Sequence, residues 1–156
     1  MDGKTLLLFV GYQGTAQGEA VTIPEEVLCK AIQIKGCRTE SVFVVGGAKY
    51  AEDLKRFHQL QDEYLLLVNN DIKSIVELVD FISEKEDRIQ QIEDRQKEIY
   101  RESSSRKRSI KNEEQYREYQ IWHMEVQEEL DELKQEKREI KRQIQLADDI
   151  IKRRFV

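Results

Sequence analysis

The longest periodic stretch of the chain reads EEQYREYQIWHMEVQEELDELKQEKREIKRQIQLADDIIKR, from Glu113 to Arg153. Apolar or aromatic residues recur in alternating steps of three and four, which is the a/d spacing of a heptad, and no Gly or Pro interrupts them. The sequence therefore predicts one long helix. Because most positions off the apolar stripe are charged or carry an amide, this helix needs a partner to cover a narrow apolar strip.

A second helical stretch lies before it. Ser74 is placed to cap this helix, with Glu77 three residues later as in a capping box, and the helix is expected to run to about Glu102. From Ser103 to Asn112 the apolar rhythm lapses and serine accumulates, which indicates a chain reversal and two antiparallel helices. The expected coiled-coil interface consists of Ile75, Val79, Ile82, Ile89, Ile92 and Ile99 on the first helix and Tyr119, Val126, Leu130, Leu133, Ile140, Ile144 and Ile151 on the second.

Residues 48–68 keep the same spacing of three and four and predict a further helix. The alternative for Tyr64 to Val68 is a strand, because its Leu-Leu-Leu-Val run also suits a buried strand. The returning helix of the hairpin is longer than the outgoing one. We expect its surplus to pack on the helix at 48–68, which completes a three-helix region over 48–156.

The first 47 residues have a different character. Residues 5–10 read as a buried strand closed by Gly11, and Gly11 to Gly18 as a loop. A helix is expected from Thr22 and Pro24 to Ile32, with Gly36 past its end, followed by a strand from Ser41 to Val45. The predicted fold is therefore mainly α: a small N-terminal β-α-β segment at 1–47, then an antiparallel helical bundle with a protruding coiled-coil hairpin.

Composition narrows the partners and the location. A net charge of −5 with 37% charged residues argues against a generally basic surface, so any contact with nucleic acid is local. Cys29 and Cys37 lack CxxC spacing and read as reduced intracellular thiols. No apolar run reaches membrane-spanning length and none resembles a signal-peptide core, so we expect a cytoplasmic protein without a membrane partner.

Catalytic signatures are not apparent in the sequence. Gly11, Gly14 and Gly18 follow the first strand, but their spacing is neither GxGxxG nor GxxxxGK[ST]. His58 and His123 are far apart and belong to no grouping with metal-ligand spacing. We therefore expect no catalytic residue, no cofactor, no metal and no enzyme. A nucleotide-dependent enzyme built on the glycine loop is a third and weaker alternative.

One charged cluster has a candidate role. The predicted reversal carries Arg101, Arg106, Lys107, Arg108 and Lys111, with Glu102 as the acid among them. Cations interleaved with serines on a stiff arm suit contact with the phosphates of a nucleic-acid backbone. The alternative is that a solvent-exposed turn simply carries charge.

The helical part also resembles a known family. The passage from Leu60 to Ser74, LQDEYLLLVNNDIKS, followed by Leu78 to Ile82, LVDFI, and then the charged hairpin, is similar to the region behind the catalytic domain of relaxases, the mobilization nucleases of mobile elements in Gram-positive bacteria. The likeness covers residues 48–152. The family nicks DNA and transfers one strand with a tyrosine and a histidine-bound metal. This chain has no matching histidine cluster, and its first 47 residues do not match the family pattern.

These observations leave two main hypotheses. The first is a noncatalytic helical-hairpin module related to relaxase tails, which assists plasmid or transposon mobilization through a relaxase or another mobilization protein and through DNA contact at the hairpin tip. The second is a structural coiled-coil protein that forms homo-oligomers through Tyr116 to Ile151 and has no role with nucleic acid.

Overall fold

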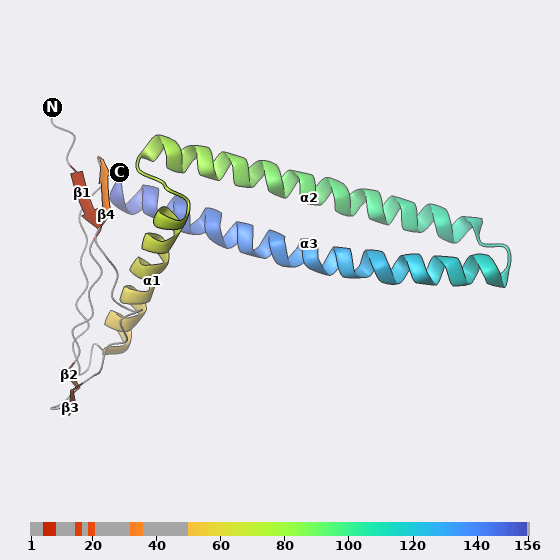
Figure 1. Ribbon diagram of the computed structural model, residues 1–156, viewed down its shortest axis with the longest axis horizontal. Helices are drawn as coiled ribbons and strands as arrows, with labels where there is room; N and C mark the ends of the chain where they lie inside the picture. The colour runs from red at the N-terminus through yellow and green to blue at the C-terminus, as the bar shows by residue number, and fades with distance from the viewer. Residues whose placement is uncertain (1–4, 9–14, 17–18, 21–31, 36–49, 156) are drawn as a thin grey trace. The chain divides into compact units, whose positions relative to one another are not determined.

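The computed structural model describes residues 5–8, 15–16, 19–20, 32–35 and 50–155. Its elements are the strands β1 (Thr5–Leu8), β2 (Thr15–Ala16), β3 (Glu19–Ala20) and β4 (Ile32–Lys35), then the helices α1 (Tyr50–Asn69), α2 (Ile75–Ser109) and α3 (Glu113–Arg154) (Figure 1). The expectation of a mainly α protein is confirmed. The contacts of the chain form two compact units, unit 1 with Met1–Ile82 and Gln145–Val156, and unit 2 with Ser83–Ile144.

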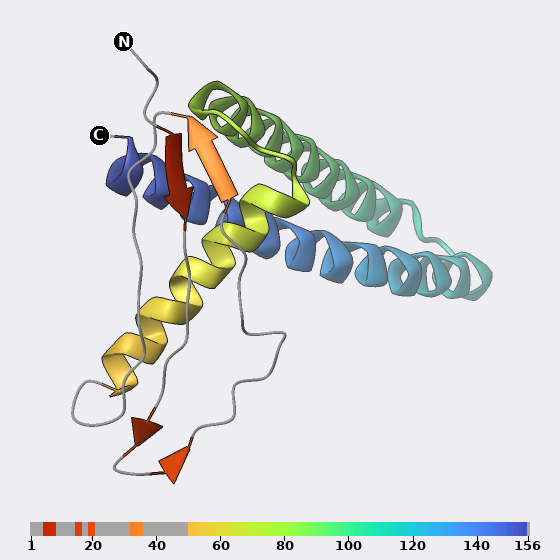
Figure 2. The same cartoon turned by 60° about the vertical axis from the view of Figure 1, so that its left-hand side comes forward.

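The strands pair in two short antiparallel ladders. Thr5 of β1 lies opposite Lys35 of β4, and β2 pairs with β3; Figure 2 shows β1 and β4 as arrows of opposite direction. The predicted helix that ends at Ile32 is wrong there, because residues 32–35 form β4, in which isoleucine alternates with polar residues at the strand period of two. β2 lies inside the predicted glycine loop. The rest of that helix, the strand predicted at 41–45 and both cysteines lie outside the described residues.

Helix α1 confirms the helix predicted from residue 48 and shows that the strand alternative for residues 64–68 is wrong. Its end is closed by a Schellman motif: the Ile72 N–H donates to the Leu67 carbonyl at 2.9 Å, and the Asp71 N–H donates to the Val68 carbonyl at 3.2 Å. Asp71 adopts the left-handed conformation that this motif requires, with φ of 52°. Ile72 and Leu67 are both buried, so an apolar contact accompanies these hydrogen bonds at the end of α1.

The start of α2 carries the predicted cap. The Glu77 N–H donates to the Ser74 hydroxyl oxygen at 3.2 Å, and the Glu77 carboxylate accepts from the Lys73 N–H at 2.5 Å. This second bond reaches one residue before the position that a standard capping box uses. Both bonds satisfy N–H groups at the start of the helix.

The core of unit 1 joins all three helices. Phe57, Leu60 and Leu67 of α1 pack in one buried cluster with residues from the start of α2 and from the end of α3, among them Leu78 and Ile150. The surplus length of α3 therefore packs with α1, as expected. No helix in residues 50–155 contains an apolar window that could span a bilayer.

The buried face of α2 in unit 1 differs in part from the predicted one. Ile75 and Val79 are 37% and 50% exposed, so their assignment to the packed interface is wrong, and Leu78 and Phe81 are buried instead. Both sets fit the period of a helix, with steps of four and of three residues, and packing against α1 and α3 decides which set is buried. Of the other predicted interface residues in this unit, Ile82 and Ile151 are partly buried against the core.

Unit 1 also buries an ionic cluster. Glu63 of α1 is fully buried, and Arg154 of α3 donates to its Oε2 from Nη2 at 3.0 Å and from Nε at 3.3 Å. Arg153 pairs with the other carboxylate oxygen. Burial, with smaller contributions from the neighbouring Arg56 and Arg154, lowers the pKa of Arg153 to about 10.

In unit 2, α2 and α3 lie antiparallel, since residues further along α2 contact residues earlier in α3. Arg88 binds Glu136, Arg95 binds Glu129, and the Ser103 and Tyr119 hydroxyls are 3.2 Å apart. The predicted interface residues Ile92, Ile99, Tyr119, Val126, Leu130 and Ile140 are buried, and Ile89, Leu133 and Ile144 are half-buried.

The connection between α2 and α3 is shorter than predicted. α2 continues past Glu102 to Ser109, so the turn is Ile110, Lys111 and Asn112. The hydroxyl of Ser109, the last residue of α2, donates to the Ser105 carbonyl at 2.9 Å, one turn earlier in the same helix. Asn112 caps α3 because its Oδ1 accepts from the Gln115 N–H at 2.9 Å.

Candidate nucleic-acid interface

The five predicted contact residues lie at the end of α2 and in the turn. Arg101, Arg106, Lys107 and Arg108 are on α2, Lys111 is in the turn, and all five are exposed. On a helix, residues seven apart share a face and adjacent residues do not. Arg101 and Arg108 therefore lie on one face of α2, and Lys107 lies on another. The structure therefore divides the cluster that the sequence presents as one group.

Arg106 is engaged within the hairpin. Its Nη2 donates to Glu102 at 2.9 Å, and its guanidinium carbon lies 4.5 Å from the centroid of the Trp122 ring on α3. The neighbouring Tyr119 ring stacks on His123 at 5.6 Å. The ion pair and the cation–π contact give Arg106 a packing role at the junction of the two helices.

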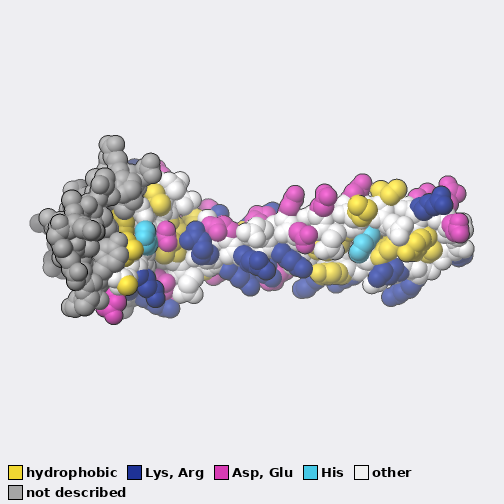
Figure 3. Space-filling view, turned by 90° about the horizontal axis from the view of Figure 1, so that it is seen from below, with side chains coloured by type: hydrophobic (Ala, Val, Ile, Leu, Met, Phe, Trp, Pro, Cys, Tyr) yellow, Lys and Arg dark blue, Asp and Glu magenta, His cyan; other side chains and the backbone are white. Residues whose placement is uncertain are grey.

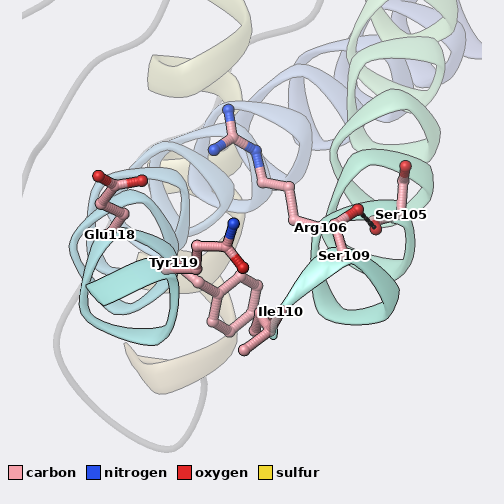
Figure 4. Close-up of a pocket in the computed structure, with 7 residues that line it drawn as sticks. Ser105, Arg106, Ser109, Ile110, Glu118 and Tyr119 are labelled. Carbon is pink, nitrogen blue, oxygen red and sulfur yellow. Dashed lines mark hydrogen bonds between the residues drawn. The ribbon is translucent and has the colours of Figure 1, made fainter. Parts of the chain in front are cut away.

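A pocket of about 200 Å³ opens beside Arg106, lined by Ser105, Arg106, Ser109, Ile110, Gln115, Glu118 and Tyr119. Figure 4 shows side chains of α2 and α3 surrounding it, with the hydrogen bond between Ser109 and Ser105 drawn. Because the lining contains the carboxylate of Glu118 as well as Arg106, its charge is mixed. This pocket does not favour a phosphate.

A second hollow, of about 350 Å³, combines two of the predicted residues. Arg101 and Arg108 line it together with Tyr100, Ser104 and Ser105, and its lining includes no acidic side chain. Guanidinium groups donate in pairs to phosphate oxygens, and serine hydroxyls add single hydrogen bonds. This hollow has the chemistry of a phosphate site. Lys107 and Lys111 line neither hollow.

A third hollow adds residues that the sequence reasoning missed. It measures about 340 Å³ and is lined by Gln96, Tyr100, Lys134, Lys137, Arg138 and Lys141. The four cations of α3 follow one another at i, i+3, i+4 and i+7, which places them on one helix face. This pattern is readable in the sequence, but it merges there with the other charges off the apolar stripe. Figure 3 shows Lys and Arg side chains following one another along unit 2, with acidic side chains beside them.

Three acidic residues of α2 that are close in sequence to Tyr100 and Arg101 are already paired. Glu93 binds Lys137 at 2.9 Å, Glu98 binds Arg95 at 3.3 Å, and Glu102 binds Arg106. The hydrogen bond and charge of Lys137 lower the pKa of Glu93, to which Lys97 and Lys141 add smaller effects. Arg101, Arg108, Lys134 and Arg138 make no ion pair within the part of the chain that the structure describes.

No group of three or more His, Cys, Asp or Glu residues with the arrangement of a metal site occurs among the described residues. Comparisons of the chain with protein-family models, with curated proteins and with solved structures found no match. The similarity to relaxase tails therefore remains a hypothesis drawn from the residues that carry it.

Proposed function

We propose that this chain is a noncatalytic helical-hairpin module, related to relaxase tails, that assists plasmid or transposon mobilization by contacts with DNA and with mobilization proteins. In this proposal α2 and α3 act as an antiparallel coiled-coil arm whose tip holds the DNA backbone. The hollow of Arg101 and Arg108 carries the proposal, because its lining combines two serines with two guanidinium groups that make no ion pair among the described residues, and it contains no acid.

In this proposal DNA binding depends on local positive charge, because the chain as a whole is acidic. The net charge of −5 repels DNA at long range, so binding depends on the few cations that reach phosphates. Each neutralised phosphate releases counterions and contributes about −0.9 to the slope of log K against log salt for duplex DNA. A site with a few such contacts binds weakly and is strongly sensitive to salt.

Arg101 and Arg108 should both contribute to the salt dependence of DNA binding. Replacing Arg101→Ala together with Arg108→Ala removes both guanidinium groups from the hollow, so we expect the salt slope for a fluorescent duplex to flatten by about 2. Fluorescence anisotropy over a salt series measures it. Both side chains are exposed, so the helical circular dichroism signal should not change.

The matched control removes two cations from unit 1, Lys55→Ala with Lys73→Ala, both of which are exposed. This variant loses the same formal charge, and we expect its salt slope to equal that of the wild type. The proposal is overturned if the wild type fails to bind DNA at low salt, or if the control loses as much affinity as the arginine variant.

Oligomerisation is the second candidate function. It is favoured by three exposed apolar side chains on α3 in unit 2, Tyr116, Ile121 and Met124. The stripe that the sequence assigned to this role is, however, largely buried inside one chain. An oligomer would therefore use a different surface or an opened hairpin.

A further inference from the structure

We propose that the ligand of unit 2 is a single nucleic-acid strand, bound along a track from Arg108 past Tyr100 to Lys141, with Tyr100 as a platform on which a base stacks. This inference rests on the proposed function and deepens it. It adds α3 residues to the site and selects single-stranded over duplex nucleic acid.

Tyr100 is the centre of this track. It lines both the hollow of Arg101 and Arg108 and the hollow of Lys134, Lys137, Arg138 and Lys141. Its side chain is 55% exposed although it is aromatic. Within the described residues its hydroxyl makes no hydrogen bond and its ring makes no aromatic contact. The packing of the hairpin therefore leaves this ring available to a ligand.

The two hollows that share Tyr100 together present cations from both helices. Lys137 is tied to Glu93, whereas Arg101, Arg108, Lys134 and Arg138 are without an ion pair among the described residues. On α2 alone, the distance from Gln96 to Arg108 is about 18 Å at a rise of about 1.5 Å per residue. That length spans roughly five phosphates at the ~3.4 Å spacing of one stacked strand.

The exposed aromatic ring decides between the two forms of nucleic acid. Sites for single strands combine a positive groove, which follows the backbone, with aromatic side chains on which bases stack. The faces of bases inside a duplex are covered by neighbouring base pairs, so a duplex would use the cations and leave Tyr100 unused. A single strand uses both features of the track.

The experiment measures anisotropy of a fluorescein-labelled oligothymidine and of a labelled duplex with wild-type protein, Tyr100→Ala and Tyr100→Phe. Loss of one stacked base should weaken single-strand binding about tenfold in Tyr100→Ala, while Tyr100→Phe keeps the ring and the affinity. Duplex binding should be weaker and the same in all three proteins. Tyr100 is exposed, so these variants should keep their helical signal.

A second arm tests the cations of α3. Replacing Lys134, Arg138 and Lys141 by glutamine should flatten the single-strand salt slope by about 2, at about 0.7 per phosphate. The control replaces Lys55, Lys73 and Lys152, three exposed lysines of unit 1, by glutamine. If the Arg101 and Arg108 variant weakens binding but Tyr100→Ala and the α3 variant do not, this inference fails and the proposed function stands. If the protein binds neither the single strand nor the duplex, this inference and the proposed function both fail.

Discussion

Glu63 and Arg154 show what a single buried residue contributes in this protein. In the sequence Glu63 is one acid among many in a charged helix, and nothing there distinguishes it from Asp62. In the structure it is fully buried, with Arg153 and Arg154 against its two carboxylate oxygens. A buried ion pair adds little net stability, but removing one partner leaves a charge without compensation in a site poor in water.

We therefore expect Glu63→Ala to lower the free energy of unfolding by about 3–5 kcal/mol, because the guanidinium of Arg154 would stay buried without its carboxylate. Urea unfolding followed by circular dichroism measures this change. The control is Glu52→Ala, which removes an exposed acid from the same helix and should cost less than about 0.5 kcal/mol. Equal costs for the two variants would show that the ionic cluster is not a structural element.

At the scale of elements, the pairing of α2 with α3 combines an apolar seam with ion pairs beside it. The guanidinium groups of Arg88 and Arg95 each donate two hydrogen bonds to a carboxylate of α3, on Glu136 and Glu129. These bonds lower the pKa of Glu129 and of Glu136 below the ordinary value of about 4.5. The groups are partly exposed, so each pair contributes little alone and mainly favours this register.

The paired carboxylates of Glu129 and Glu136 make the stability of the protein depend on pH. Because the folded pKa lies below the unfolded one, the stabilisation is complete above about pH 4.5 and is lost as the pH falls through the lowered pKa. We expect the stability difference between wild type and a Glu129→Gln, Glu136→Gln variant to be largest near neutral pH and to shrink in acid. Thermal unfolding across a pH series tests this.

The control for that series is Glu125→Gln with Glu128→Gln. Both of these acids are exposed on α3 and make no ion pair within the described residues. Their replacement should leave a small difference from wild type that changes little with pH. A paired-residue variant that behaves like this control would contradict the role of the cross-helix pairs.

For α2, the sequence predicted the buried residues correctly in unit 2 but not at the start of the helix. The heptad spacing identified Ile92 and Ile99 correctly, because in unit 2 the helix has a single apolar stripe. At the start of α2, both Ile75 with Val79 and Leu78 with Phe81 fit the period of a helix, so the sequence does not decide which pair is buried. The turn was also predicted too long, since serine and arginine in residues 103–109 tolerate a helix that cross-helix contacts stabilise.

On the scale of the whole molecule, burial of the apolar stripe of α3 within one chain favours a monomer over an oligomer. Val126, Leu130 and Ile140 are the residues that a coiled-coil partner would need, and they are buried within the chain. We expect the mass from light scattering to remain that of one chain, 18.5 kDa, as concentration rises. A mass that increases with concentration in the wild type would favour the oligomerisation hypothesis.

A variant in which the buried interface between α2 and α3 is disrupted provides a second test of the oligomeric state. Ile92→Asp with Ile99→Asp places charges in the buried interface and removes the apolar cover of α3, at a cost of several kcal/mol. We expect this variant to lose helicity or to associate, whereas Val76→Asp, at a 65% exposed position of the same helix, should behave like wild type.

The sequence alone determined the three helices, the cap at Ser74, the reversal before Glu113 and the basic character of the hairpin tip. Each of these depends on neighbours within a few residues, through helical periodicity, capping side chains and local charge. The tertiary structure decided which apolar face of α2 is buried, that Glu63 meets Arg154, and that Tyr100 joins Arg101 and Arg108 to the cations of α3. These outcomes join residues distant in sequence, and they arise only when the helices pack.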